Sequence, residues 1–168
     1  MRARGLNGLI VYFNGQHTML RFNPLLYLTD FKTLGPAFLF VPGEGEPALL
    51  ISPDWDLPRA RETVPFASIR SVPQPLLART AAEMAKALPR PFAIAGREHM
   101  TAAFAQDFLP LIDADGDAGD LIDGLAATRT EIELERVSRA AAIADAGFAA
   151  LRDAARVGMR EHELAAEV

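Results

Sequence analysis

The chain of 168 residues contains no cysteine. A disulfide framework, a thiolate zinc site and a thiol nucleophile are therefore excluded, and nothing in the sequence requires an oxidising compartment. Lysine is scarce, with Lys32 and Lys86 only, and the net charge at pH 7 is −5. Proteins that bind nucleic acids usually carry a basic patch or stripe. We therefore expect no nucleic-acid partner.

Long apolar runs are also missing. The run near the N-terminus, residues 9–13, is too short for a signal-peptide core and is followed by no small-residue cleavage site. No segment approaches the roughly 20 apolar residues that span a bilayer. We therefore expect a cytoplasmic protein without a membrane partner. Half of the residues are hydrophobic, which is ordinary for a globular domain with its own core.

Familiar catalytic motifs are absent as well. The three histidines, His17, His99 and His162, are far apart and form no metal-ligand spacing such as His-Glu-x-x-His. The serines stand in neither a Gly-x-Ser-x-Gly nor a Ser-x-x-Lys context. The residues by themselves therefore predict no active site.

The first two-thirds of the chain alternates short apolar segments with turn residues. Strands are expected at residues 8–13, 35–41, 48–51, 69–72 and 92–95, and helices at residues 76–88 and 101–108. The glycines and prolines of residues 42–47 suit a hairpin between the second and third strands. Strands that alternate with helices indicate an α/β fold, and the hairpin makes the sheet mixed rather than wholly parallel.

Residues 113–120 form an aspartate-rich segment that invites a calcium hypothesis. An EF-hand loop that begins at Asp113 needs glycine at its sixth position and glutamate at its twelfth, where this chain has Ala118 and Gly124. We therefore interpret the segment as a solvated acidic turn. It is also the best candidate for a linker between two parts of the chain.

The last third changes to alanine-rich helical periodicity. Apolar residues at spacings of three and four are expected on one helix face: Leu134, Val137, Ala141, Ala144, Phe148, Leu151 and Ala155. Thr130 and Glu133 suit a capping box at the start, and Gly158 suits the end of the helix. A second helical pattern runs from Glu161 to Val168 without a closing cap. We therefore expect a chain cut from a longer one.

Two segments resemble a known family. Residues 23–31, Asn-Pro-Leu-Leu-Tyr-Leu-Thr-Asp-Phe, resemble the Asn-x-x-Tyr-Leu-Thr-Gly-Phe signature of the N-terminal domain in the creatinase, prolidase and aminopeptidase P family of metallohydrolases. Residues 129–165 resemble the linker and opening helices of the family's pita-bread catalytic domain. Two departures stand out, because Asn23 lies one residue further from Tyr27 than usual and Asp30 replaces a glycine. Aspartate adopts positive φ less readily than glycine, so we expect the local turn to differ.

The resemblance implies two parts. Residues 1–125 would form a ribonuclease-H-like α/β domain around a mixed sheet, and residues 126–168 the incomplete helical start of the catalytic domain. In the family, two aspartates, a histidine and two glutamates further along hold two divalent metal ions, such as Mn, Co or Zn. Water between the metals attacks an amide or amidine carbon. The resemblance thus implies a parent enzyme that hydrolyses Xaa-Pro peptides or creatine-like compounds. It implies no catalytic residue, metal ligand or cofactor in this chain, which should be inactive alone.

Family members are typically homodimers in which the N-terminal domain closes the neighbouring subunit's active site. By resemblance, Lys32 would pair with a substrate carboxylate and Phe31 would wall the pocket. The alternative is that Phe31 belongs to the core and Lys32 is only solvated. Trp55 and Arg59 are candidates for a dimer contact, because tryptophan and arginine are favoured at interface centres. Their alternative is a half-buried aromatic beside a free charge.

A different class of function stays open. The chain can be a stand-alone binding or dimerisation module without hydrolase activity, and the apolar stripe of residues 134–155 can be a dimerisation helix. Continuation of the reading frame into metal ligands would exclude the stand-alone module. Sedimentation of the chain with and without residues 126–168 would test the dimerisation helix.

Overall fold

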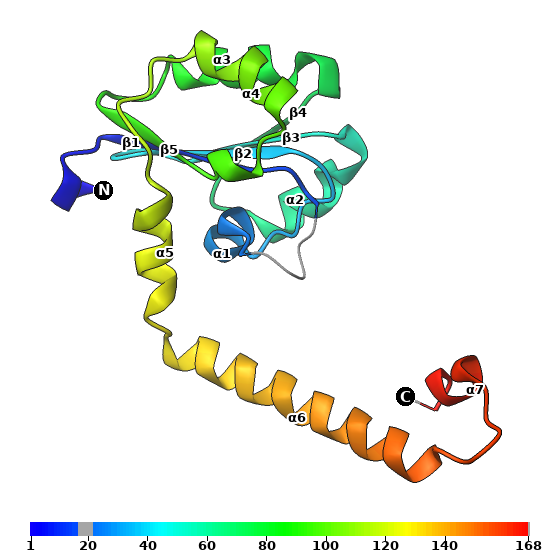
Figure 1. Cartoon of the computed structure of the whole chain (residues 1–168). Helices are drawn as coiled ribbons and strands as arrows, with labels where there is room; N and C mark the ends of the chain where they lie inside the picture. Colours follow the sequence, from blue (N-terminus) through cyan, green and yellow to red (C-terminus); the bar gives the residue numbers. More distant parts are fainter. Residues whose placement is uncertain (17–21, 168) are drawn as a thin grey trace. The chain divides into compact units, whose positions relative to one another are not determined.

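The computed structural model describes residues 1–16 and 22–167, and the chain divides into two compact units, residues 1–126 and 127–168. Figure 1 shows the helices and strands: β1 Gly8–Phe13, α1 Pro24–Thr29, β2 Ala37–Pro42, β3 Ala48–Ile51, α2 Leu57–Thr63, β4 Ser68–Ser71, α3 Leu77–Ala85, β5 Phe92–Ala95, α4 Ala102–Phe108, α5 Gly119–Ala127, α6 Glu131–Ala154 and α7 Glu161–Ala165. Short 3₁₀ helices lie between them: η1 Arg2–Arg4, η2 Asp54–Asp56, η3 Gln74–Leu76, η4 Arg97–His99 and η5 Leu109–Leu111. No helix in the described ranges is long and apolar enough to cross a membrane.

A five-stranded mixed sheet forms the centre of the first unit, in the order β4-β3-β2-β1-β5. β2 pairs antiparallel with β1 and with β3, while the pairs β1–β5 and β3–β4 are parallel. The expected mixed α/β sheet and the expected hairpin of β2 and β3 are confirmed. Since only β2 runs in the opposite direction, the other four strands end at one edge, which we call the carboxyl edge.

Helices cover both faces of this sheet (Figure 1). On β1, Leu9, Val11 and Phe13 point into a core with α1, α2 and α5, which we call the α1–α2 core. Ile10 and Tyr12 point into a second core with α3 and α4, which we call the α3–α4 core. Because both faces of β1 are covered, its sequence is a continuous apolar run rather than an alternating one.

Residues 113–120 do not form a linker. They run along β5, where the Asp115 and Ala118 N–H groups donate to the carbonyl oxygens of Phe92 and Ile94, each at 2.8 Å. The Asp115 carboxylate accepts a further hydrogen bond from the Phe92 N–H at 2.9 Å. The linker prediction is therefore wrong, because this polar segment is fastened to the sheet edge and belongs to the first unit.

Asp115 makes the attachment of this segment sensitive to acid. Its pKa lies below the ordinary value of 3.8 because the carboxylate accepts the Phe92 N–H and, next, a bond from the Arg90 guanidinium. A carboxyl group with a lowered folded-state pKa stabilises the fold above its unfolded pKa and loses that contribution as the pH falls through the folded value. We expect the urea concentration at the midpoint of unfolding to decrease as the pH is lowered below about 4. In Asp115→Asn this decrease is expected to be smaller. Asp107→Asn, at an exposed position of α4, is the control. Identical pH profiles for Asp115→Asn and the wild-type chain would contradict this role.

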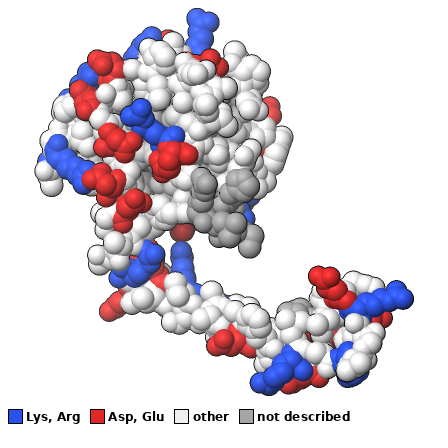
Figure 2. All heavy atoms as spheres, in the orientation of Figure 1, with Lys and Arg blue, Asp and Glu red and all other residues white. Residues whose placement is uncertain are grey.

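The two ends of the first unit lie together. The Arg4 guanidinium in η1 forms an ion pair with the Asp120 carboxylate in α5, at 2.7 Å. On the face of the chain shown in Figure 2, basic and acidic side chains are interspersed. The ion pair of Arg4 and Asp120 therefore joins two segments of the first unit that are 116 residues apart in sequence.

The second unit is helical. At the start of α6, the Glu133 carboxylate accepts from the Thr130 N–H at 2.7 Å, and Thr130 Oγ1 accepts from the Glu133 N–H, which confirms the expected capping box. The prediction that Gly158 ends this helix is wrong, because the backbone already turns extended at Ala155. Gly158, with φ 91°, instead lies in a turn before α7, where positive φ is free of steric cost. The second helix begins at Glu161 as expected, and Val168 lies outside the described residues.

The apolar stripe of α6 lies at the surface of the chain. Leu134, Val137 and Phe148 are 53%, 59% and 72% exposed. Ile132 and Ile143, on the same helix but outside the stripe, are also exposed. The expected apolar face is therefore present, and its role as a dimerisation surface stays a prediction.

Candidate functional site at the carboxyl edge

The signature segment folds as a short capped helix that leads to the carboxyl edge. Asn23 caps α1 through its side-chain oxygen, which accepts from the Leu26 N–H at 2.9 Å. Tyr27 donates its hydroxyl to the Leu125 carbonyl oxygen of α5 at 3.1 Å. Asp30 ends the helix in the left-handed conformation, with φ 55° and ψ 6°. Asp30 thus adopts a positive φ, a conformation that costs glycine nothing but costs a residue with a side chain.

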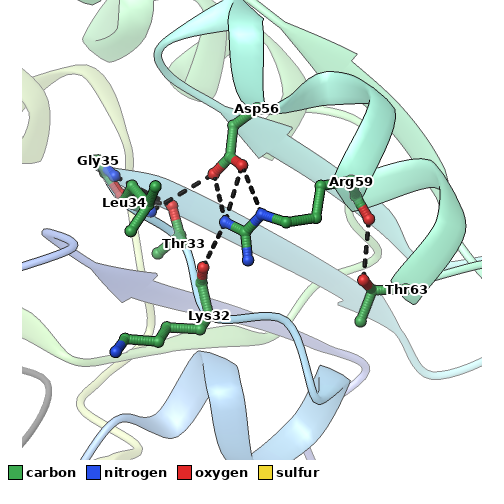
Figure 3. A network of polar contacts seen from close by, with 7 residues as sticks. All are labelled: Lys32, Thr33, Leu34, Gly35, Asp56, Arg59 and Thr63. Carbon is green, nitrogen blue, oxygen red and sulfur yellow. Dashed lines mark hydrogen bonds and ion pairs between the residues drawn. The ribbon is translucent and has the colours of Figure 1, made fainter.

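Arg59 of α2 contacts two other residues singled out from the sequence, Phe31 and Lys32, and Figure 3 shows it with Lys32. Its guanidinium carbon lies 4.6 Å from the centre of the Phe31 ring, and Nη2 donates to the Lys32 carbonyl oxygen at 2.6 Å. Trp55 lies on η2, directly before α2. One edge of the sheet therefore holds both predicted pairs: Phe31 and Lys32, predicted to contact substrate, and Trp55 and Arg59, predicted to contact a partner subunit.

Asp56 is the residue that sequence reasoning missed. Its carboxylate, in a residue only 3% exposed, accepts from Arg59 Nε and Nη2, each at 2.9 Å. It also lies 3.4 Å from the Leu34 N–H, which donates to it. Two parallel charge-assisted hydrogen bonds fix both position and direction. The available signal was the spacing of Asp56 and Arg59, since residues three apart share a helix face.

The geometry separates the four predicted side chains. Phe31 is fully buried in the α1–α2 core, which is the alternative position given for it from the sequence. It therefore exposes no surface that could line a pocket in this chain. Lys32 is exposed, and its ammonium group extends away from the ion pair (Figure 3). The Arg59 guanidinium is not a free charge, because it forms an ion pair with the Asp56 carboxylate. Trp55 is 63% exposed. The substrate role of Lys32 and the interface role of Trp55 stay predictions.

Beside Trp55 the carboxyl edge is hollowed into a cleft of about 420 Å³, which we call the edge cleft. Its lining residues are Tyr12, Asn14, Gln16, Leu34, Gly35, Pro36, Ser52, Pro53, Trp55, Gln74, Thr101 and Phe104. Tyr12 lies at the end of β1 and Phe104 on α4, and the others lie on the loops and 3₁₀ helices beside the carboxyl ends of the strands. Ligands of open α/β sheets bind outside the carboxyl ends of the strands, and the edge cleft has this location.

The edge cleft exists because three loops approach one another closely. A Cβ atom on Gly15 would lie 2.6 Å from the backbone of Gly35, and one on Gly35 would overlap the carbonyl oxygen of Ser52. Thr33 fixes the middle loop, since its hydroxyl donates to the Gly35 carbonyl oxygen at 2.6 Å. Glycine is therefore required at both positions to keep these loops in contact.

One wall of the edge cleft is aromatic. The rings of Tyr12 and Phe104 are stacked with centroids 5.3 Å apart. Burial raises the pKa of Tyr12 to about 12, so its hydroxyl stays protonated at neutral pH. Within residues 1–16 and 22–167, no three histidine, aspartate or glutamate side chains are grouped to hold a metal ion. The described side chains that line this cleft offer stacking and neutral hydrogen bonds.

Solved structures define the class of this fold. The first unit has the α/β fold of creatinase/prolidase N-terminal domains, which the resemblance implied, and a helical extension follows it. The chain is similar to X-Pro aminopeptidase from Thermotoga maritima MSB8, with TM-score 0.76 and 16% identity over 99% of this chain and 46% of that chain. It is also similar to Xaa-Pro dipeptidase from Bacillus anthracis, with TM-score 0.73 and 18% identity over 99% of this chain and 44% of that one.

A separate N-terminal domain gives the same result. The creatinase/prolidase N-terminal domain of an X-Pro dipeptidase from Streptococcus pyogenes matches with TM-score 0.53 and 15% identity, over 73% of this chain and 90% of that chain. No protein-family model and no curated protein matches the chain. The chain spans less than half of the length of the aminopeptidase and the dipeptidase that it matches.

Proposed function

We propose that this chain is the N-terminal, non-catalytic part of a metal-dependent hydrolase that acts on Xaa-Pro peptides or on a small amide or amidine. One observation carries the proposal. The chain matches an X-Pro aminopeptidase and an Xaa-Pro dipeptidase over 99% of its own length, while it spans 46% and 44% of theirs. The rest of such a protein would supply the divalent metal pair, Mn, Co or Zn, and with it the activation of water.

The role proposed for the first unit is to contribute to a homodimer and to shape the active site of the partner subunit. The exposed side chains of Lys32, Leu34 and Trp55 at the carboxyl edge support this role. The Lys32 ammonium is suited to a substrate carboxylate, and Leu34 and Trp55 offer apolar contact. Asp56 and Arg59 act as positioning residues, because they hold the Lys32 carbonyl oxygen and the Leu34 N–H.

Metal dependence tests the proposal. The product of the complete reading frame that contains this chain, stripped with a chelator, is expected to hydrolyse an Xaa-Pro dipeptide or creatine only after Mn²⁺, Co²⁺ or Zn²⁺ is restored. The 168-residue chain alone is expected to be inactive under every condition. Product release measured by chromatography provides the readout. Chelator-insensitive hydrolysis by the 168-residue chain would contradict the proposal, and so would a complete product that stays inactive with all three metals.

A further inference from the structure

The two outer strands of the sheet, β5 and β4, differ in what lies beside them. Along β5 the chain covers its own edge, since the Asp115 and Ala118 N–H groups donate to carbonyl oxygens of that strand. Within the described parts of the chain, β4 pairs with β3 and with no other strand. An outer strand without a neighbour presents unpaired backbone groups that can bind another strand. β4 is therefore the edge at which this sheet can be extended.

Two residues of β4 direct their backbone groups away from the sheet. The Ser68 and Val72 N–H groups donate toward β3, to carbonyl oxygens within residues 47–51, at 2.9 and 3.1 Å. Because successive N–H groups of a strand point to opposite sides, the N–H and C=O groups of Ile69 and Ser71 point away from β3. No residue that the structure describes forms a hydrogen bond with these outward groups. They are available to a neighbouring strand.

Two prolines define the length of this edge. Pro65 and Pro73 have no N–H group, and they bracket the segment of residues 66–72. Ile69 lies at the centre of this segment. When two such segments are placed antiparallel with Ile69 opposite Ile69, every residue of one segment has a partner in the other. The edge is therefore complementary in length to itself, which favours a second copy of this chain as the occupant.

The side chains suit the same register. Ile69 is partly buried against the α1–α2 core, and the register places the two copies of Ile69 side by side. Arg70 and Ser68 are both exposed, and the guanidinium of one copy faces the hydroxyl of the other. A register centred on Arg70 would instead place the two guanidinium groups opposite each other, and like charges in this arrangement are unfavourable. The charge pattern therefore selects the pairing centred on Ile69.

We propose that β4 pairs antiparallel with β4 of a second copy of this chain, about a two-fold axis at Ile69, so that the two sheets become one. The Ile69 N–H of each copy donates to the Ile69 carbonyl oxygen of the other, and the Ser71 N–H donates to the Ala67 carbonyl oxygen of the other. This inference goes beyond the proposed function, because it names the strand through which the chain binds itself. Its failure leaves the metal-dependence test of the hydrolase unaffected.

The charge at residue 68 provides the test. Sedimentation equilibrium of the 168-residue chain is expected to give a Kd of about 0.1–1 mM, because the paired segment is short. Ser68→Glu is expected to tighten the dimer about twofold to thirtyfold, since the carboxylate faces Arg70 of the other copy and the contact occurs twice. Ser68→Arg is expected to weaken it by a similar factor. Gln106→Glu and Gln106→Arg make the same charge changes at an exposed position of α4 and are expected to leave the Kd unchanged.

Spectra locate the contact. In ¹H–¹⁵N spectra over a series of concentrations, the amide signals of Ile69 and Ser71 are expected to shift. Ser71→Pro removes an outward N–H without touching the bonds to β3, and proline is tolerated on an outer strand. It is expected to abolish the shifts while the other sheet amides stay unchanged. If Ser71→Pro does not fold, the Ser68 variants decide alone.

Three results overturn the proposal. The first is the absence of association at about 1 mM chain. The second is association of equal strength in Ser68→Glu and Ser68→Arg. The third is a set of concentration-dependent shifts confined to another surface, such as the exposed stripe of α6.

Discussion

Replacement of Arg59 by methionine is expected to destabilise the chain more than replacement of its partner Asp56 by asparagine. In Arg59→Met, the Asp56 carboxylate remains in a site that is 3% exposed and loses its counter-charge. Removal of the partner of a buried carboxylate costs at most about 3–5 kcal/mol, the range for fully buried ion pairs. In Asp56→Asn, the guanidinium left behind is 42% exposed and can be hydrated. That loss is about 1–3 kcal/mol, the cost of hydrogen bonds left unmade.

Urea unfolding of the two variants measures the difference. Arg61→Met is the matched control, since Arg61 lies on the same helix, α2, at an exposed position. The loss in the double variant is expected to be smaller than the sum of the single losses, because the two residues interact directly. Equal losses from Arg59→Met and Asp56→Asn, or a loss from Arg59→Met no larger than that from Arg61→Met, would contradict the ion-pair argument.

Gly96→Ala is expected to cost about 2–5 kcal/mol of unfolding free energy. Gly96 follows β5 with φ 85°, and a Cβ atom there would overlap the carbonyl oxygen of Tyr12 on the neighbouring strand β1. The left-handed backbone costs a residue with a side chain about 1–2 kcal/mol. Displacement of a packed strand by the methyl group adds a cost of about 1–3 kcal/mol. The two costs act together because the same methyl group both makes the left-handed backbone unfavourable and meets the backbone of β1.

Gly5→Ala separates these two costs. Gly5 has φ 66°, yet a Cβ atom there would have no neighbour within 4 Å. Gly5→Ala is therefore expected to lose only the backbone contribution, about 1–2 kcal/mol. Both variants are compared by urea unfolding at neutral pH. Equal losses at the two positions would show that the predicted overlap with Tyr12 is relieved without disturbing the sheet.

The strands could be predicted because burial on both faces gives them continuous apolar runs, as in β1 and β2. The capping box of α6 could be predicted because it depends on residues three apart in the sequence. The sequence left two positions open for Phe31, in a pocket wall or in the core, since its burial follows from the packing of α1 and α2 on one face of the sheet. The Asp56–Arg59 pair could have been predicted from its spacing of three residues, whereas the hydrogen bond from the Leu34 N–H could not, because it joins residues 22 apart.

Two predictions are wrong for different physical reasons. Residues 113–120 have the composition of a solvated turn, but they pair with β5, and that partner cannot be read from local composition. A glycine with positive φ suits a helix end and a tight turn equally well, and Gly158 serves the turn. The edge cleft also escaped prediction, because its lining comes from loops that only the sheet order brings together.

The ion pair of Arg4 and Asp120 has a consequence for the evolution and engineering of this domain. It joins a residue near the start of the first unit to one near its end. Domains with neighbouring ends tolerate insertion into other chains and circular permutation, because no cut passes through the sheet. The first unit is in this sense a portable module, which can be attached to different proteins through a single pair of adjacent connections.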